Sequence, residues 1–111
     1  MERWILIVCH ERPQLADLQG EWQKKGISAR IVQDAGEVAG ELSGNTDYLL
    51  VIIFSDGRQY LPPLKIIRGL IKAPILILDR QYDSTEKTAA IKAGADEYIK
   101  WTDSYLEETI A

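Results

Sequence analysis

The sequence is poor in cysteine and histidine, with one of each, and it has no long apolar run. Cys9 cannot form a disulfide within the chain, and this cysteine usage is typical of the reducing cytoplasm. The longest uninterrupted apolar run, residues 48–54, has seven residues, whereas a membrane-spanning helix needs roughly 18. The apolar start MERWILIV is short and soon reaches the polar HERPQ, so it lacks the features of a secretory signal. We therefore expect a cytoplasmic protein with no membrane partner.

The sequence also lacks an excess of positive charge. Its 13 Lys and Arg residues are outnumbered by 17 Asp and Glu residues, and the basic residues are scattered along the chain. A domain that binds nucleic acid by itself gathers basic residues on one face, so these residues are not expected to bind DNA alone. The length of 111 residues and the apolar fraction of 46% are those of one folded domain, residues 1–111.

Five short segments have the composition of β-strands. Residues 4–8, 48–54 and 75–78 are continuously apolar, as in strands buried on both faces. Residues 27–32 alternate and residues 97–101 include charged side chains, which is typical of edge strands.

Segments with helical periodicity separate and follow these strands. Capping residues at their starts, and glycine or proline after their ends, delimit the expected helices: residues 13–25, 34–43, 62–72, 84–93 and 104–110. Strict alternation of strand and helix predicts an α/β fold, a flavodoxin-like (βα)5 doubly wound parallel sheet. The strand order 2-1-3-4-5 places the two weaker strands at the edges, and functional residues are expected beyond the carboxyl ends of the strands.

Two segments on either side of the fourth helix resemble a known family. The sequences APILILD (residues 73–79) and AGADEYI (residues 93–99) resemble the fourth and fifth strands of receiver domains of two-component response regulators. Residues 4–8 and 47–52 resemble the first and third strands of that family, so the resemblance covers nearly the whole chain. It implies a signalling domain that works through protein partners.

The chain departs from that family at every position of the phosphorylation site. By this resemblance, Cys9 and His10 stand where the family has an acidic pair that binds Mg²⁺, and Ile52 stands where it has the phosphoacceptor aspartate. Asp79 replaces the threonine or serine after the fourth strand, and Trp101 replaces the lysine after the fifth. Aspartyl phosphorylation needs a carboxylate nucleophile, a divalent cation and a neutralising positive charge. We therefore expect a degenerate pseudo-receiver that is not an enzyme and has no cofactor.

The aromatic residues of this region leave further questions open. Tyr98 retains the switch-like aromatic position of the family, and its side chain could point inward or outward. Trp101 could fill the former phosphorylation pocket or pack against the fifth helix.

Two alternative functions use other residues near the same edge. In the first, Asp56 is the phosphoacceptor and Glu11 with Asp79 holds a divalent metal; the competing interpretation of Asp56 is a solvated Asp-Gly turn. In the second, the crevice is a small-ligand or metal sensor that uses Cys9, His10 and Trp101, although neighbouring residues of an extended chain make a poor chelate. Residues 9–13 include no glycine, so binding of FMN or NAD is not expected.

The remaining candidate is a protein-binding surface. In the receiver family, the face formed by the fourth helix, fifth strand and fifth helix commonly forms dimers, and here it has mixed charges that suit a homodimer: Lys87, Asp96, Glu97 and Lys100. The last helix begins only shortly before Ala111, which suggests the N-terminal part of a longer regulator. We expect a transcription regulator that reaches DNA only through a separate effector domain.

Overall fold

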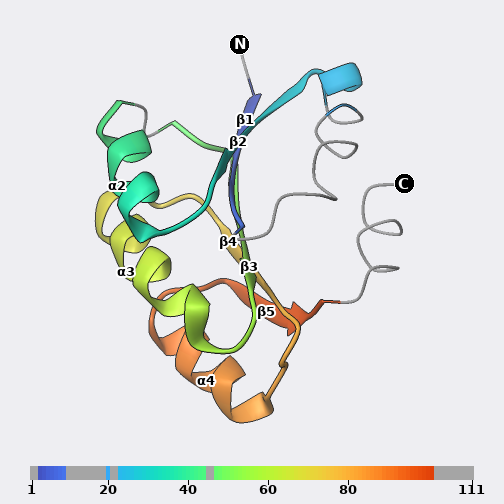
Figure 1. The fold of residues 1–111 in the computed structure, drawn as a ribbon, viewed down its shortest axis with the longest axis vertical. Helices are drawn as coiled ribbons and strands as arrows, with labels where there is room; N and C mark the ends of the chain where they lie inside the picture. Colours follow the sequence, from blue (N-terminus) through green and yellow to red (C-terminus); the bar gives the residue numbers. More distant parts are fainter. Residues whose placement is uncertain (1–2, 10–19, 21–22, 45–46, 102–111) are drawn as a thin grey trace.

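The computed structural model of this 111-residue chain describes residues 3–9, 20, 23–44 and 47–101 (Figure 1). His10 and Glu11 lie outside the described residues, as do most of the predicted first helix and the whole of the predicted fifth helix. The statements below concern the described residues.

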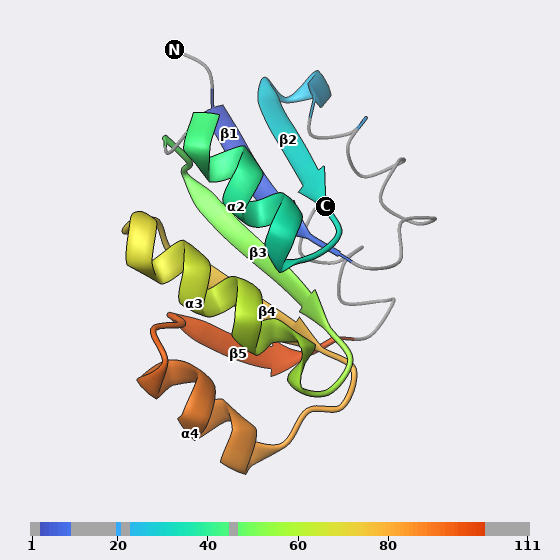
Figure 2. The ribbon, with the colours of Figure 1, turned by 60° about the vertical axis from the view of Figure 1, so that its left-hand side comes forward.

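Five parallel strands form one sheet in the order β2-β1-β3-β4-β5. The strands are β1 (Arg3–Val8), β2 (Ile27–Val32), β3 (Leu50–Ser55), β4 (Ile75–Asp79) and β5 (Glu97–Lys100). The predicted strand order is confirmed, and the two strands with polar side chains, β2 and β5, lie at the edges (Figure 2). Their charged side chains are tolerated there because an edge strand faces solvent on one side.

Three helices cover one face of this sheet: α2 (Ala35–Gly44), α3 (Leu61–Leu70) and α4 (Ser84–Lys92) (Figures 1 and 2). A short 3₁₀ helix, η1 (Arg58–Tyr60), precedes α3. Asp83 caps α4, since its side chain accepts a hydrogen bond of 2.8 Å from the amide of Thr85. At the start of α2, Asp34 accepts from the amide of Glu37, whose carboxylate accepts from the amide of Gln33. Asp34 is therefore the N-cap of α2, and Glu37 adds a second hydrogen bond at this end of the helix, to the residue before the cap.

Apolar residues fill both faces of the sheet, as the continuous apolar runs predict. Along β3, Val51 and Ile53 belong to the core cluster that includes Leu64 and Ile67 of α3. Ile52 and Phe54 alternate with them and belong to a second cluster on the opposite face. Because side chains of a strand alternate between faces, each central strand contributes to both clusters.

Candidate functional site

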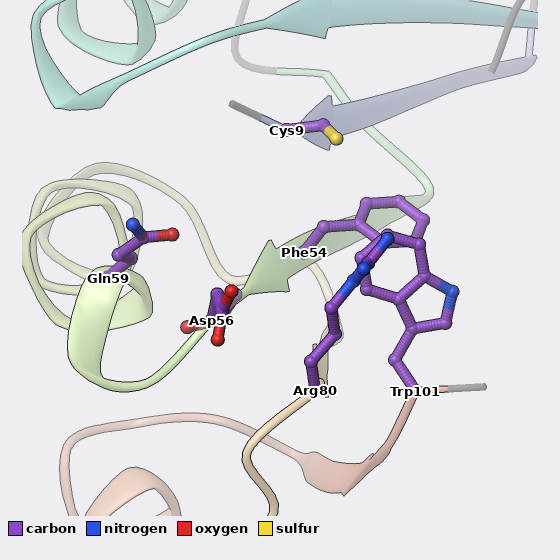
Figure 3. A pocket seen from close by; sticks show the side chains of 7 residues that line it. Cys9, Phe54, Asp56, Gln59, Arg80 and Trp101 are labelled. Carbon is purple, nitrogen blue, oxygen red and sulfur yellow. The ribbon is translucent and has the colours of Figure 1, made fainter. Parts of the chain in front are cut away.

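A small pocket of about 60 Å³ lies at the carboxyl edge of the sheet (Figure 3). It is lined by residues that follow or end β1, β3, β4 and β5: Cys9, Phe54, Ser55, Asp56, Gln59, Arg80 and Trp101. The structure therefore brings together three of the residues singled out in the sequence, Cys9, Asp56 and Trp101. Ligands of doubly wound folds bind at this edge, near the strand where the order reverses.

An aromatic pair forms one wall of this pocket. The rings of Phe54 and Trp101 lie edge to face, with centroids 4.9 Å apart. The guanidinium of Arg80 lies over the Trp101 ring, 4.1 Å from its centroid, in a cation–π contact (Figure 3). The indole Nε1 of Trp101 is buried and has no hydrogen-bond partner among the residues that the structure describes. This wall therefore consists of two aromatic rings with one guanidinium cation stacked on the indole.

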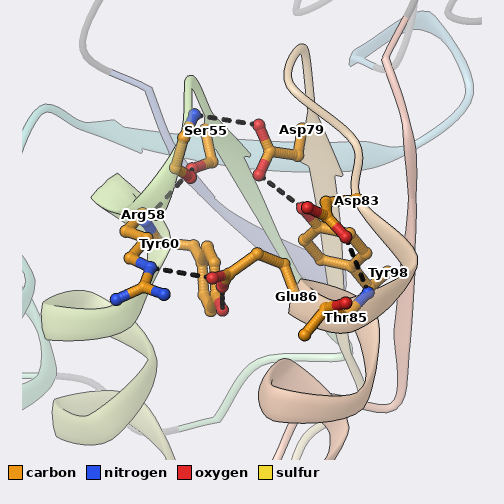
Figure 4. A network of polar contacts seen from close by, with 9 residues as sticks. Ser55, Arg58, Tyr60, Asp79, Asp83, Thr85, Glu86 and Tyr98 are labelled. Carbon is orange, nitrogen blue, oxygen red and sulfur yellow. Dashed lines mark hydrogen bonds and ion pairs between the residues drawn. The ribbon is translucent and has the colours of Figure 1, made fainter.

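Asp79 ends β4 but does not line the pocket. Its side chain is fully buried, and its carboxylate accepts three hydrogen bonds. The amides of Gly57 and Gln81 donate to Oδ1 at 3.0 and 2.9 Å. The hydroxyl of Tyr98 donates to Oδ2 at 2.6 Å (Figure 4). Both oxygens are therefore used within the fold.

Tyr98 lies entirely inside the protein, which answers the open question of its orientation. Its ring lies between Tyr60 and Tyr82, with centroid separations of 5.7 and 5.4 Å. Burial, and then the hydrogen bond to Asp79, raise the pKa of Tyr98 well above its usual range. Tyr98 is therefore the proton donor and Asp79 the acceptor at neutral pH.

A second set of polar contacts extends this network to α4 (Figure 4). The hydroxyl of Tyr60 donates to Glu86 at 2.6 Å, and Arg58 Nε donates to the other oxygen of Glu86 at 2.7 Å. Burial and the hydrogen bond to Glu86 raise the pKa of Tyr60 to about 12, and the bond from Tyr60 lowers the pKa of Glu86. Ser55 links the set to β3, since its hydroxyl accepts from the amide of Tyr60 at 3.1 Å.

The sequence analysis did not identify Ser55, Arg58, Tyr60 or Glu86 as members of a network. Tyr60 and Glu86 are 26 residues apart in the chain, and no spacing rule pairs residues at that separation. The available signal was weak: two tyrosines, at positions 60 and 98, in otherwise aliphatic or charged segments.

Asp56 lies in the loop after β3 and is exposed. One of its oxygens accepts a hydrogen bond of 2.7 Å from the side-chain amide of Gln81. The next residue, Gly57, has a φ of +81°, a conformation that glycine adopts without strain. Asp56 thus has the local geometry of an Asp-Gly turn, as the competing interpretation of this residue predicts. It also borders the pocket.

Comparison with solved structures decides the fold. A two-component response regulator from Clostridium difficile superposes with a TM-score of 0.80 at 21% identity, covering 97% of this chain and 92% of that one. The receiver domain of the Francisella response regulator 1452 gives 0.77 at 19% identity, with 97% and 93% covered. An orphan response regulator of H. pylori gives 0.78 at 18% identity, with 97% and 90% covered. The chain has the receiver-domain fold. No family model and no curated protein matches the sequence.

The resemblance to the receiver family, followed along the third strand, places the phosphoacceptor position at Ile52. The structure places Ile52 in the middle of β3, buried and away from the pocket lining. Phe54, two residues further on the same face, lines the pocket and contacts Trp101. A period of two identifies the face of a strand but not the depth along it, so counting along the strand does not show which residue of this face reaches the pocket.

Receiver domains that accept phosphate use Mg²⁺, and the described residues of this pocket do not suit that ion. Magnesium needs oxygen ligands in octahedral geometry. The described lining offers one carboxylate, Asp56, with the neutral oxygens of Ser55 and Gln59, and these lie beside the thiol of Cys9, the Phe54–Trp101 pair and the cation of Arg80. Asp79 is engaged with Gly57, Gln81 and Tyr98. Among residues 3–9, 23–44 and 47–101, no group of three His, Cys, Asp or Glu side chains could hold a metal ion.

The four residues proposed for a dimer surface of this receiver fold have different environments. Asp96 accepts hydrogen bonds from Arg68 at 2.9 Å and from the amide of Ile75 at 2.8 Å, so its charge is used within the domain. Lys87 of α4 and Glu97 of β5 form an ion pair of 3.4 Å at the surface. The pKa of Glu97 is lowered mainly because its carboxylate accepts a hydrogen bond from the amide of Tyr98, and further by the contact with Lys87. Lys100 is exposed at the end of β5.

The described helices are all short. None of them is long and apolar enough to cross a membrane.

Proposed function

We propose that this receiver fold is a phosphorylation-independent signalling module that acts by protein docking or homodimerisation, without enzymatic activity. The observation that supports this most directly is the pocket wall made by Phe54 and Trp101, with Arg80 over the indole. Phe54 and Trp101 take the positions that in a phosphorylatable receiver hold the acceptor aspartate and the lysine. A phenyl ring has no nucleophilic atom, and an indole cannot neutralise the charge of a transferred phosphoryl group.

The location of the charges supports the same function. The carboxylate that lines the described part of the pocket, Asp56, is exposed and bound to Gln81. Asp79 is buried and points toward Tyr98. Both oxygens of Asp79 already accept hydrogen bonds within the fold, so this carboxylate is poorly placed to bind a divalent cation together with Asp56. Phosphotransfer through Asp56 is therefore the weaker alternative.

A fluorescence titration tests this proposal. Mg²⁺ and beryllofluoride, which mimics the phosphoryl group on an aspartate, are added to the full chain while tryptophan emission is recorded. Trp101 lies in the pocket, and a Trp101→Phe variant separates its signal from those of Trp4 and Trp22. We expect no saturable change. A saturable, Mg²⁺-dependent change that disappears in Asp56→Ala would restore a phosphorylation switch and overturn the proposal.

The partner surface is proposed at α4 and β5, with Lys87, Glu97 and Lys100 as its charged residues. Asp96 is unsuitable for the test because its reversal would remove the contacts with Arg68 and Ile75. Lys100→Glu changes an exposed charge on β5, and Lys72→Glu, just after α3, is the matched control. We expect sedimentation velocity to show weaker self-association for Lys100→Glu than for Lys72→Glu. Equal association of both variants, or a monomeric parent chain, excludes this face as a dimer interface.

The proposed setting is a cytoplasmic regulator in which these residues form the receiver part and a separate domain acts on DNA. The H. pylori structure that this chain resembles is described as an orphan response regulator, which is compatible with a receiver fold that works without a dedicated phosphate signal.

A further inference from the structure

The Asp79 carboxylate is a buried anion held entirely by hydrogen bonds. Its donors come from three segments of the chain: Gly57 in the loop before η1, Gln81 in the loop before α4, and Tyr98 in β5. None of the ion pairs found among the described residues involves Asp79. Burying a charge is costly unless it is fully hydrogen-bonded. Asp79 therefore strongly favours the arrangement in which all three segments are close to it.

The same three segments determine the shape of the face formed by α4 and β5. The loop before α4 is also joined to the end of β3, because the amide of Arg80 donates to the carbonyl of Ser55, the last residue of β3, at 3.0 Å. Arg58 and Tyr60 of η1 then both bind Glu86 in the first turn of α4. The position of α4 is thus connected through hydrogen bonds to the loops that surround Asp79 (Figure 4).

The buried Tyr98 side chain is held by a hydrogen bond as well as by ring packing. The contacts with Tyr60 and Tyr82 surround the ring, but a buried hydroxyl without an acceptor is unfavourable. Asp79 Oδ2, at 2.6 Å, is that acceptor. A charged acceptor forms a stronger hydrogen bond than a neutral hydroxyl would at the same position.

We propose that Asp79 is a permanent latch: its carboxylate holds Tyr98 inward and joins the loops before η1 and α4, so that the α4–β5 face keeps one conformation without any covalent modification. In the family that this chain resembles, the corresponding residue is a threonine or serine that follows the phosphoryl group. The carboxylate replaces that conditional contact with a constant one. The use of the fixed α4–β5 face for docking rests on the proposed function. The existence of the latch does not, and it can be tested separately.

Fluorine NMR of the full chain labelled with 3-fluorotyrosine tests the latch. The chain has five tyrosines, and the signal of Tyr98 is assigned by its loss in Tyr98→Phe. In the parent chain we expect one Tyr98 signal that is protected from a soluble gadolinium chelate. In Asp79→Ala we expect this signal to become severalfold more sensitive to the chelate, and the amides of Gly57 and Gln81 to exchange with solvent at least about tenfold faster, because a hydrogen bond to a charged acceptor is lost at each site.

The matched control is Asp56→Ala. Asp56 also bridges the two loops through Gln81, but it is exposed and does not contact Tyr98. We expect the Tyr98 signal to be unchanged in this variant. If Asp79→Ala does not fold, Asp79→Asn preserves the size of the side chain and removes the charged acceptor, and the same change in Tyr98 is expected.

Two results would overturn the latch. In the first, the fluorine signal of Tyr98 remains single and protected from the chelate in a folded Asp79 variant, which would mean that ring packing alone holds Tyr98. In the second, Asp56→Ala changes the Tyr98 signal as much as Asp79→Ala does. The beryllofluoride titration separates this inference from the proposed function: a flat titration with an unprotected Tyr98 removes only the latch, and a responsive titration with a protected Tyr98 removes only phosphorylation independence.

Discussion

Replacing Tyr98 by phenylalanine isolates the energetic role of one buried hydroxyl. The substitution keeps the ring and its contacts with Tyr60 and Tyr82. It removes the donor to Asp79 Oδ2, which lies in a side chain with no solvent exposure. A buried charged acceptor that loses its partner costs about 2–3 kcal/mol of the free energy of unfolding.

Tyr60→Phe is the matched control, because it also removes a tyrosine hydroxyl that donates to a carboxylate at 2.6 Å. Its acceptor, Glu86, is 18% exposed and has Arg58 as a second partner. Water and the guanidinium can replace the lost donor, so we expect a cost of only about 1 kcal/mol.

Urea unfolding monitored by far-ultraviolet circular dichroism at pH 7 measures both costs. With an m-value of about 1.5 kcal/mol/M, Tyr98→Phe should lower the midpoint by about 1.7 M and Tyr60→Phe by about 0.7 M. The double variant Asp79→Ala/Tyr98→Phe should lose less free energy of unfolding than the sum of the two single variants, because both substitutions remove the same hydrogen bond. Equal midpoints for Tyr98→Phe and Tyr60→Phe would refute the reasoning, since Asp79 would then be as well solvated as Glu86.

Two further predictions concern the backbone and the pH. Gly94→Ala should lower the free energy of unfolding by about 1–3 kcal/mol, because Gly94 has a φ of +119° and an added Cβ would lie 2.7 Å from Arg68 Cγ. Gly40→Ala, in α2 with open space around it, should instead raise it by about 0.5–1 kcal/mol; chemical denaturation compares the two, and equal signs would contradict the prediction. Folded-state pKa values of Tyr60 (about 12) and Tyr98 (higher) exceed the unfolded value of 10, so their stabilisation is complete below pH 10 and is lost as the pH rises toward 12. The slope approaches about 1.4 kcal/mol per pH unit for each tyrosine, and Tyr60→Phe should reduce it; an unchanged slope in that variant would exclude the contribution of Tyr60.

The cluster around Arg68 shows contacts of Asp96 that the sequence does not reveal. Asp96 stands out in the sequence as a charged residue on the expected dimer face. In the structure its carboxylate binds Arg68 and the amide of Ile75, while Arg68 also donates to the carbonyls of Gly94 and Ala73. All of these contacts except the one with Ala73 join segments more than 20 residues apart, and no local pattern predicts them.

The sequence by itself determined the strands, the sheet order and the edges. Continuous apolar runs identify β1, β3 and β4 because a strand covered on both faces needs apolar residues at every position. It also determined which residues reach one end of the sheet: Cys9, Asp56 and Trp101 border one pocket because the carboxyl ends of parallel strands share an edge.

Only the tertiary structure decided how those residues are used. Alternation along β3 gave the face of Ile52 and Phe54 but not which of them reaches the pocket, because depth depends on the register with β1 and β4. The orientation of Asp79 depends on donors from three separate segments, and that of Tyr98 depends on Asp79. Periodicity and capping are local properties of a chain, whereas the environment of a buried charge is a property of the packed fold.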